Sequence, residues 1–99
     1  MNILSNYLKN KRKEKLYSKL FEISVDSAKF LKDSQTYKES ANNVRFLISN
    51  SSTIALHNYL EDYNRKIQDY EAKSSIAYQQ YLNAQEKISI IQQELNNIC

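Results

Sequence analysis

The sequence predicts an all-α fold in which two long helices form an antiparallel coiled-coil hairpin. Its 99 residues include no glycine and no proline, so the residues that most often make turns are missing. Apolar and small residues recur in both halves of the chain at spacings that alternate between four and three, which is the signature of a coiled-coil seam. A single polar run, Ser-Asn-Ser-Ser-Thr at 49–53, separates the two halves and is the one credible turn.

We therefore expect a single hairpin over 1–99, with a helix over about 5–48, a turn over about 49–53 and a second helix over about 54–98. Ser5 is a candidate N-cap for the first helix, because a serine hydroxyl can accept a bond from a free backbone N–H. Ser51, Ser52 or Thr53 would begin the second helix in the same way.

Each helix has one predicted seam. The first seam comprises Leu16, Leu20, Ile23, Ser27, Phe30, Ser34, Tyr37, Ala41, Val44 and Ile48. The second seam comprises Leu56, Leu60, Tyr63, Ile67, Tyr70, Ser74, Ala77, Tyr81, Ala84, Ile88, Ile91, Leu95 and Ile98. Side chains three and four apart share one face of a helix, so each seam presents a narrow stripe to the other.

A symmetric fold-back at the polar run sets the expected register of the two seams. It pairs Leu16 with Ile88 and Ser34 with Tyr70, and in several layers a large residue then faces a small one, as dense packing requires. On the N-terminal side of Leu16 the apolar pairing fails, because polar and basic residues of the first helix would face the end of the second seam. Three apolar residues are left without an apolar partner in this register: Ile91, Leu95 and Ile98.

Composition limits the classes of function. Residues 1–48 carry ten Lys/Arg and five Asp/Glu, a net +5, whereas 53–99 carry four and six, a net −2. Cys99 is the only cysteine, which excludes an internal disulfide and fits a reducing compartment. Neither a signal peptide nor a membrane-spanning run is recognisable, so we expect a cytoplasmic protein, unless a system that needs no signal peptide exports it.

Catalysis has little support in the sequence. His57 is the only histidine, and with Glu61 one turn later it is typical of a surface hydrogen-bonded pair rather than an acid–base couple. Cys99 would lie at the opposite end of the hairpin from His57, and no spacing of His, Cys and Asp suggests a metal site. We expect a protein that is not an enzyme and that needs no cofactor or metal.

The densest charge feature is the basic segment 9–15, Lys-Asn-Lys-Arg-Lys-Glu-Lys. It is either a solvated helix face or a contact for an acidic protein surface. Nucleic acid is a weaker partner, because the second helix is acidic, and Leu4, Tyr7 and Leu8 form too narrow an apolar face for membrane insertion. Aromatic and aliphatic residues beside the first seam either pack over its edge or contact a partner protein. The candidate partner-binding residues are Lys9, Arg12, Lys13, Lys15, Tyr17, Phe21, Leu31, Ile91, Leu95 and Ile98.

Two stretches resemble the FliJ/YscO-type stalk proteins of type III export machines. Residues 60–67, Leu-Glu-Asp-Tyr-Asn-Arg-Lys-Ile, resemble the stretch that opens the second helix of that family. Residues 8–16, Leu-Lys-Asn-Lys-Arg-Lys-Glu-Lys-Leu, look like its opening helix, although this chain is shorter than is usual for the family. The resemblance implies a cytoplasmic rod at the base of a secretion apparatus. It would enter the hole of a hexameric secretion ATPase, contact the export-gate protein and, as some members do, carry secretion chaperones.

Two other functions stay open. A small helical hairpin is also similar to the WXG100-like partners or targeting factors of type VII-secreted effectors, although the Trp-x-Gly turn of the standard form is missing. Alternatively, the chain is a type III secretion chaperone that dimerises into a four-helix bundle and buries Tyr17, Phe21 and Leu31 between hairpins.

Overall fold

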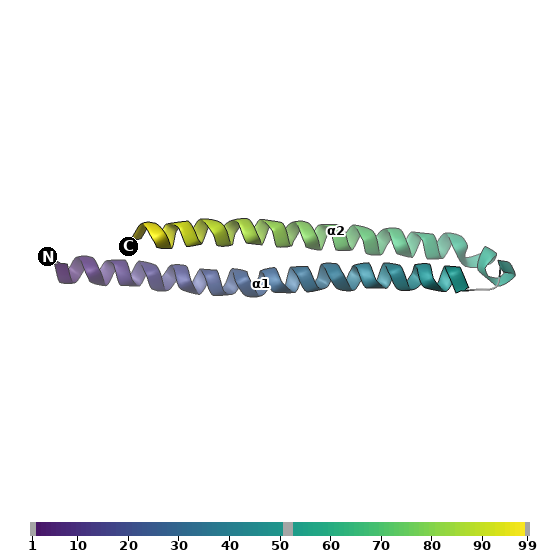
Figure 1. The fold of residues 1–99 in the computed structure, drawn as a ribbon, viewed down its shortest axis with the longest axis horizontal. Helices are drawn as coiled ribbons and strands as arrows, with labels where there is room; N and C mark the ends of the chain where they lie inside the picture. Colours follow the sequence, from purple (N-terminus) through teal and green to yellow (C-terminus); the bar gives the residue numbers. More distant parts are fainter. Residues whose placement is uncertain (1, 51–52, 99) are drawn as a thin grey trace. The chain divides into compact units, whose positions relative to one another are not determined.

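The computed structural model describes residues 2–50 and 53–98, with the side chains of 3–50 and 59–98. Every described residue is helical: α1 spans Asn2–Asn50 and α2 spans Thr53–Ile98 (Figure 1). The two helices pack against each other, which confirms the predicted all-α class. The first helix begins before Ser5, the expected cap. Several sequence-based expectations lie outside the described residues: those on Ser51, Ser52, the side chains of Thr53, Leu56 and His57, and Cys99.

The last turn of α1 is closed by its own side chains. Ser49 Oγ donates a hydrogen bond to the carbonyl oxygen of Arg45 at 3.0 Å, and Asn50 Nδ2 donates to that of Phe46 at 2.9 Å. Both bonds reach the carbonyl four residues earlier, a pattern that Ser and Asn side chains form within a continuing helix. The polar residues at 49 and 50, expected in the turn, are thus part of α1.

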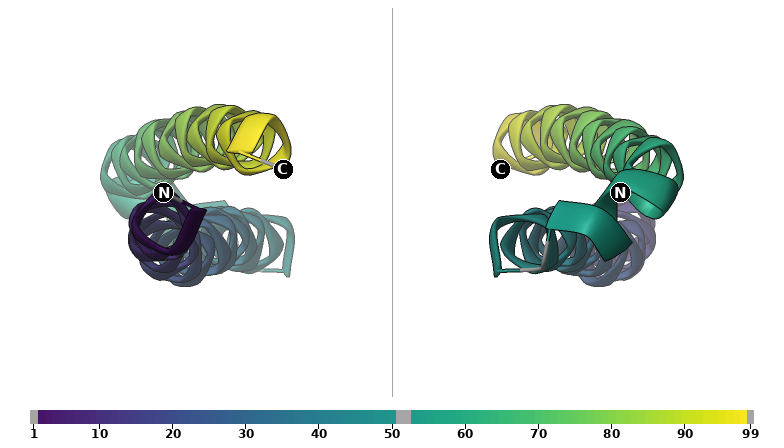
Figure 2. Two further views of the ribbon diagram at one scale, coloured as in Figure 1. Left: turned by 90° about the vertical axis from the view of Figure 1, so that its left-hand side faces the viewer. Right: turned by 90° about the vertical axis from the view of Figure 1, so that its right-hand side faces the viewer.

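The packing divides the hairpin into two compact units. The first unit joins the N-terminal part of α1, up to Lys29, to the C-terminal part of α2, from Gln80. The second unit comprises 30–79, which is the rest of α1 and the N-terminal part of α2. In each unit two helical segments lie side by side. The end-on views show no third element beside the helical pair in the described chain (Figure 2).

The predicted seams are confirmed by burial. All ten seam residues of α1, and all twelve whose side chains are described in α2, are buried or half-buried. Nearly all other described residues are exposed. The heptad spacing alone thus located the packed face of both helices, because residues three and four apart share one face whatever the rest of the helix carries.

Small residues dominate the fully buried positions. The most buried side chains are those of Ala41 and Ser27, which are 1% and 2% exposed. The other buried seam residues are Leu16, Ser34, Ala77, Ala84, Ile91 and Leu95. A pair of helices encloses a methyl or hydroxymethyl group completely, but a larger side chain protrudes beside the contact line. For this reason Phe30 and Tyr70, although on the seam, are only half-buried.

The register differs from the symmetric fold-back. In the second unit Ser34 hydrogen-bonds Ser74, whereas the expected layer put Ser34 opposite Tyr70. In the first unit Leu16 packs with Ile91 and Leu95, beyond the expected Ile88. Relative to the symmetric fold-back, the register is displaced by about one helical turn. Figure 1 shows the first turns of α2 past the end of α1.

Candidate protein-binding surfaces

The shifted register overturns one expectation about the site. Ile91, Leu95 and Ile98 were expected to lack an apolar partner, but Ile91 and Leu95 are only 7% and 9% exposed and form a core cluster with Leu16. Ile98 is half-buried against the same cluster. These three residues hold the first unit together and do not offer a free apolar surface.

The basic segment 9–15 lies at the end of α1 in the first unit. Lys9, Arg12 and Lys15 are exposed, and Lys13 is half-buried. Lys9 and Arg12 line a shallow hollow together with Glu94, Asn97 and Ile98 at the end of α2. The last residues of α2 are therefore level with about 9–12 of α1, and the preceding turns of α1 have no segment of α2 alongside them (Figure 1).

The overhanging turns of α1, residues 3–8, are apolar and exposed. Four of their side chains are 56% to 87% exposed: Ile3, Leu4, Tyr7 and Leu8. Residues at these spacings lie on one side of a helix, so they make a single apolar face. Lys11 Nζ lies 5.8 Å from the centre of the Tyr7 ring, a cation–π contact that links this face to the basic segment.

The sequence indicates part of this apolar face, Leu4, Tyr7 and Leu8, which by itself is too narrow for membrane insertion. Ile3 widens it, and the signal that would have found it is the concentration of aliphatic and aromatic residues before Lys9. Its exposure was not predictable from spacing, because it depends on the register between α1 and α2.

The other predicted contact residues differ in how far they are exposed. Tyr17 and Phe21 are 58% and 71% exposed, and Val25, which is not among the predicted contact residues, continues their row at 53%. These residues are four apart and form a strip on one side of α1. Leu31 is half-buried and belongs to the second unit.

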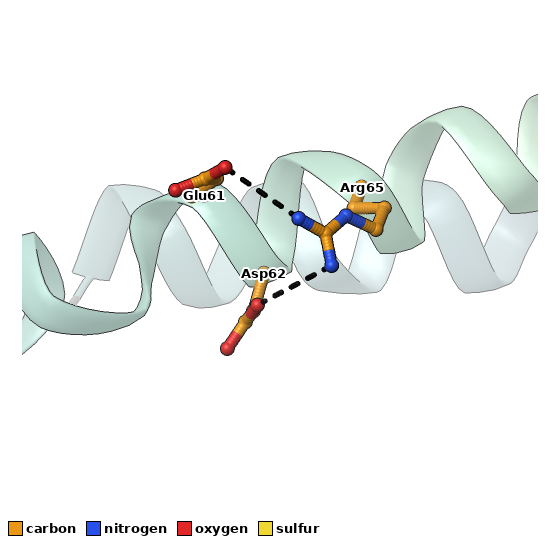
Figure 3. Close-up of polar contacts among 3 residues, drawn as sticks. All are labelled: Glu61, Asp62 and Arg65. Atoms are coloured by element: carbon orange, nitrogen blue, oxygen red, sulfur yellow. Dashed lines mark hydrogen bonds and ion pairs between the residues drawn. The ribbon is translucent and has the colours of Figure 1, made fainter.

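The stretch 60–67, which resembles the stalk proteins, is accounted for by its position in the hairpin. Leu60, Tyr63 and Ile67 lie on the seam. The intervening Glu61, Asp62 and Arg65 form a small surface ion-pair cluster (Figure 3), defined by two distances: 3.5 Å from Arg65 Nη2 to Glu61 Oε1, and 4.0 Å from Arg65 Nη1 to Asp62 Oδ1.

The three charged side chains of this cluster are 65% to 90% exposed, and exposed ion pairs at such spacings contribute only a few tenths of a kcal/mol. These residues are therefore explained by packing and surface charge.

In the described part of the chain, no group of three or more His, Cys, Asp and Glu side chains is arranged to hold a metal ion. No helix within those residues has the length and hydrophobicity needed to cross a membrane. Every buried side-chain nitrogen or oxygen of the described residues has a hydrogen-bond partner.

Comparison of the chain with protein-family profiles, with curated protein sequences and with solved structures finds no match in any of the three.

Proposed function

We propose that the chain is a non-enzymatic central-stalk component of a type III protein secretion system. It would bind the hexameric export ATPase through the end of the hairpin that carries both termini, and couple that ATPase to the export gate at the cytoplasmic base of the apparatus. The single observation that supports this is the overhang of α1, where the exposed apolar face 3–8 is followed directly by the basic segment 9–15.

The overhang suits insertion into a ring for two physical reasons. It is one helix wide, and its exposed apolar face would gain free energy when the wall of a central hole removes it from water. The cations that follow would meet acidic loops at the rim, and such charge complementarity speeds association and fixes orientation. The resemblance of 8–16 and 60–67 to stalk proteins adds to this proposal, although 60–67 is also accounted for by the hairpin itself.

The test uses the purified full chain and the hexameric export ATPase from the same genome. We expect co-elution on gel filtration and faster ATP hydrolysis. Both should be lost in a fourfold charge reversal of the basic segment, in which Lys9, Arg12, Lys13 and Lys15 are each replaced by Glu. A matched reversal of four exposed lysines elsewhere, Lys29, Lys32, Lys38 and Lys66, should keep both. Absence of binding by the unaltered chain would refute the stalk.

A second variant tests the role of the apolar face. Replacing Leu4 and Leu8 by Ser should weaken ATPase binding without lowering helix content, because both side chains are already exposed. Replacing Phe46 and Ile76, which are 68% and 62% exposed in the second unit, should leave binding unchanged. Equal losses in the two double variants would show that the overhang has no special role.

A second candidate function is favoured by the strip of Tyr17, Phe21 and Val25. An exposed strip of this kind on a hairpin could cover an apolar helix of a secreted needle or translocator subunit, as a secretion chaperone does. In that case Phe21→Ser should abolish binding to the secreted subunit, while the fourfold reversal of the basic segment should not. Retained binding in Phe21→Ser would exclude this strip as the chaperone surface.

A further inference from the structure

The first unit contains a shallow groove on one side of its seam. Its apolar floor is formed mainly by exposed Ile90 and half-buried Ile23, which lie over the buried side chains of Leu16 and Ile91. Its rims are charged and consist of Lys19, Glu22, Lys87 and Glu94. Ile90 is 49% exposed, so the floor is open to a partner. We call this feature the charged groove. It lies apart from the overhang of α1 and from Tyr17 and Phe21.

The separation from the aromatic strip follows from helical spacing. Lys19 and Glu22 each come directly before a seam residue, whereas Tyr17 and Phe21 each come directly after one. Successive residues are about 100° apart on a helix, so these two sets flank the seam on opposite sides.

The charges along the groove change sign at its middle. On α1 the row runs Lys15, Lys19, Glu22, Asp26, at spacings of four, three and four, which keeps it on one helix face. On α2 the corresponding row runs Lys87, Ile90, Glu94. Each row is thus positive at its N-terminal end and negative at its C-terminal end. Within the described part of the chain, none of these charged groups takes part in an ion pair.

We propose that the charged groove is the interface of an antiparallel homodimer. The two-fold axis would pass between Lys19 and Glu22 on α1 and beside Ile90 on α2. The packing of Leu16 with Leu95 and Ile91 brings these two midpoints level with each other, so one axis serves both helices. Such an interface is isologous, with the same surface on both copies.

The symmetry pairs every rim charge with an opposite one. Lys19 of each copy faces Glu22 of the other, and Lys87 faces Glu94, which makes four ion pairs around the groove. The Ile90 side chains of the two copies meet near the axis and cover each other's apolar floor. A row that reverses its charge about its own centre is self-complementary only when it meets a copy of itself in antiparallel orientation.

A parallel arrangement fits less well. In that case α1 of one copy would lie over α2 of the other, and Ile90 would face the stretch between Lys19 and Glu22. The two Ile90 side chains would then lie on opposite sides of the groove, each against charged residues, and would not cover each other. Pairing of Glu22 with Lys87 across the groove of one chain is the other alternative, but the two form no ion pair in the structure.

The proposal is tested with a matched pair of charge variants. One variant replaces Lys19 and Lys87 by Glu, and the other replaces Glu22 and Glu94 by Lys. Each alone gives rims of a single sign, so light scattering across a concentration series should show a dimer weakened on the order of a hundredfold. A mixture of the two variants should restore a heterodimer, because every rim pair is again opposite in charge. Reversals at Lys32 and Lys66, or at Glu39 and Asp69, should leave the dimer unchanged.

A cross-link tests the orientation. In a Cys99→Ser background, Ile90→Cys should form a disulfide between copies on mild oxidation, since Ile90 lies next to the axis. A wild-type chain that is monomeric throughout the concentration series would overturn the proposal. A dimer that persists in both charge variants, or that fails to cross-link at Ile90, would show that the charged groove is not the dimer interface. Loss of ATPase binding in the variant with Leu4 and Leu8 replaced by Ser bears on the proposed function alone, because that variant changes no charge along the groove.

Discussion

Ser34 and Ser74 exchange hydrogen bonds across the seam of the second unit. Ser34 Oγ donates to the carbonyl oxygen of Ser74 at 3.0 Å, and Ser74 Oγ donates to that of Ser34 at 2.8 Å. The two hydroxyl oxygens lie 3.2 Å apart. A short side chain can reach the backbone of the facing helix only where the two helices approach closely. The pair therefore marks a close contact in the hairpin and satisfies two polar groups that burial would otherwise penalise.

Enlarging a small seam residue should separate the helices. Ala41 is 1% exposed, and Ala41→Leu forces additional methylene groups into a contact with no space for them. We expect a loss of about 1–3 kcal/mol in the free energy of unfolding, measured by urea titration with circular dichroism. Ala72→Leu is the control, because Ala72 is exposed on α2 in the same unit. Equal stability of the two variants would mean that Ala41 is not packed between the helices.

The register can be tested by cross-linking within one chain. In a Cys99→Ser background, Ser34→Cys with Ser74→Cys should oxidise to an intramolecular disulfide, since the native hydroxyls nearly touch. Ser34→Cys with Tyr70→Cys, the pair in the symmetric register, should oxidise more slowly. Mass spectrometry of the oxidised monomer distinguishes the two, and faster oxidation of the Tyr70 pair would restore the symmetric register.

Burial of Ile91 predicts a role in stability. Ile91→Ala removes most of a side chain that is 7% exposed, and we expect a cost of about 2–4 kcal/mol in the free energy of unfolding. Phe21→Ala removes a larger side chain that is 71% exposed and should cost well under about 1 kcal/mol. Thermal unfolding of the two variants side by side checks this. If Ile91→Ala unfolds at the same temperature as the unaltered chain, Ile91 does not contribute to the core and is again a candidate for partner contact.

Arg45 and Glu71 form an ion pair between the helices of the second unit. Their side chains are 47% and 50% exposed, so solvent screens the pair, and we expect a coupling free energy of about 0.5 kcal/mol from a double-mutant cycle to Ala. Because salt screens exposed charges, the coupling should fall toward zero at about 1 M NaCl. A coupling that persists in high salt would show that packing of the side-chain stems, rather than charge, joins the two residues.

The buried face of each helix could be predicted from the sequence, because it depends only on residues a few positions apart. The four-three spacing defined which residues of each helix are buried, and that assignment is confirmed along both seams. The helix ends were less predictable. Ser49 and Asn50 are polar residues typical of turns, yet their side chains bond the preceding carbonyls and continue α1. Residues of this kind can either leave a helix or close its last turn, and sequence alone does not decide between these outcomes.

The candidate surfaces were less predictable still, because exposure depends on the register between the helices. Lys9, Arg12, Tyr17 and Phe21 stay candidates for partner contacts, whereas Ile91 is removed from that set by its burial against Leu16. A shift of one turn was enough to cover one apolar group, and the same register defines the charged groove. The sequence contained both charge rows, but only packing shows that their midpoints are level.

The sequence by itself determined that the chain forms two helices, and which face of each helix packs, because helical periodicity relates residues only a few positions apart. The tertiary structure alone decided which residues face one another across the seam, and with them the apolar overhang of α1 and the charged groove. Those relationships depend on how many residues the connection uses and on where small side chains such as Ser34 and Ser74 let the helices meet. Such long-range contacts are decided by the packing of the whole interface, which no local pattern encodes.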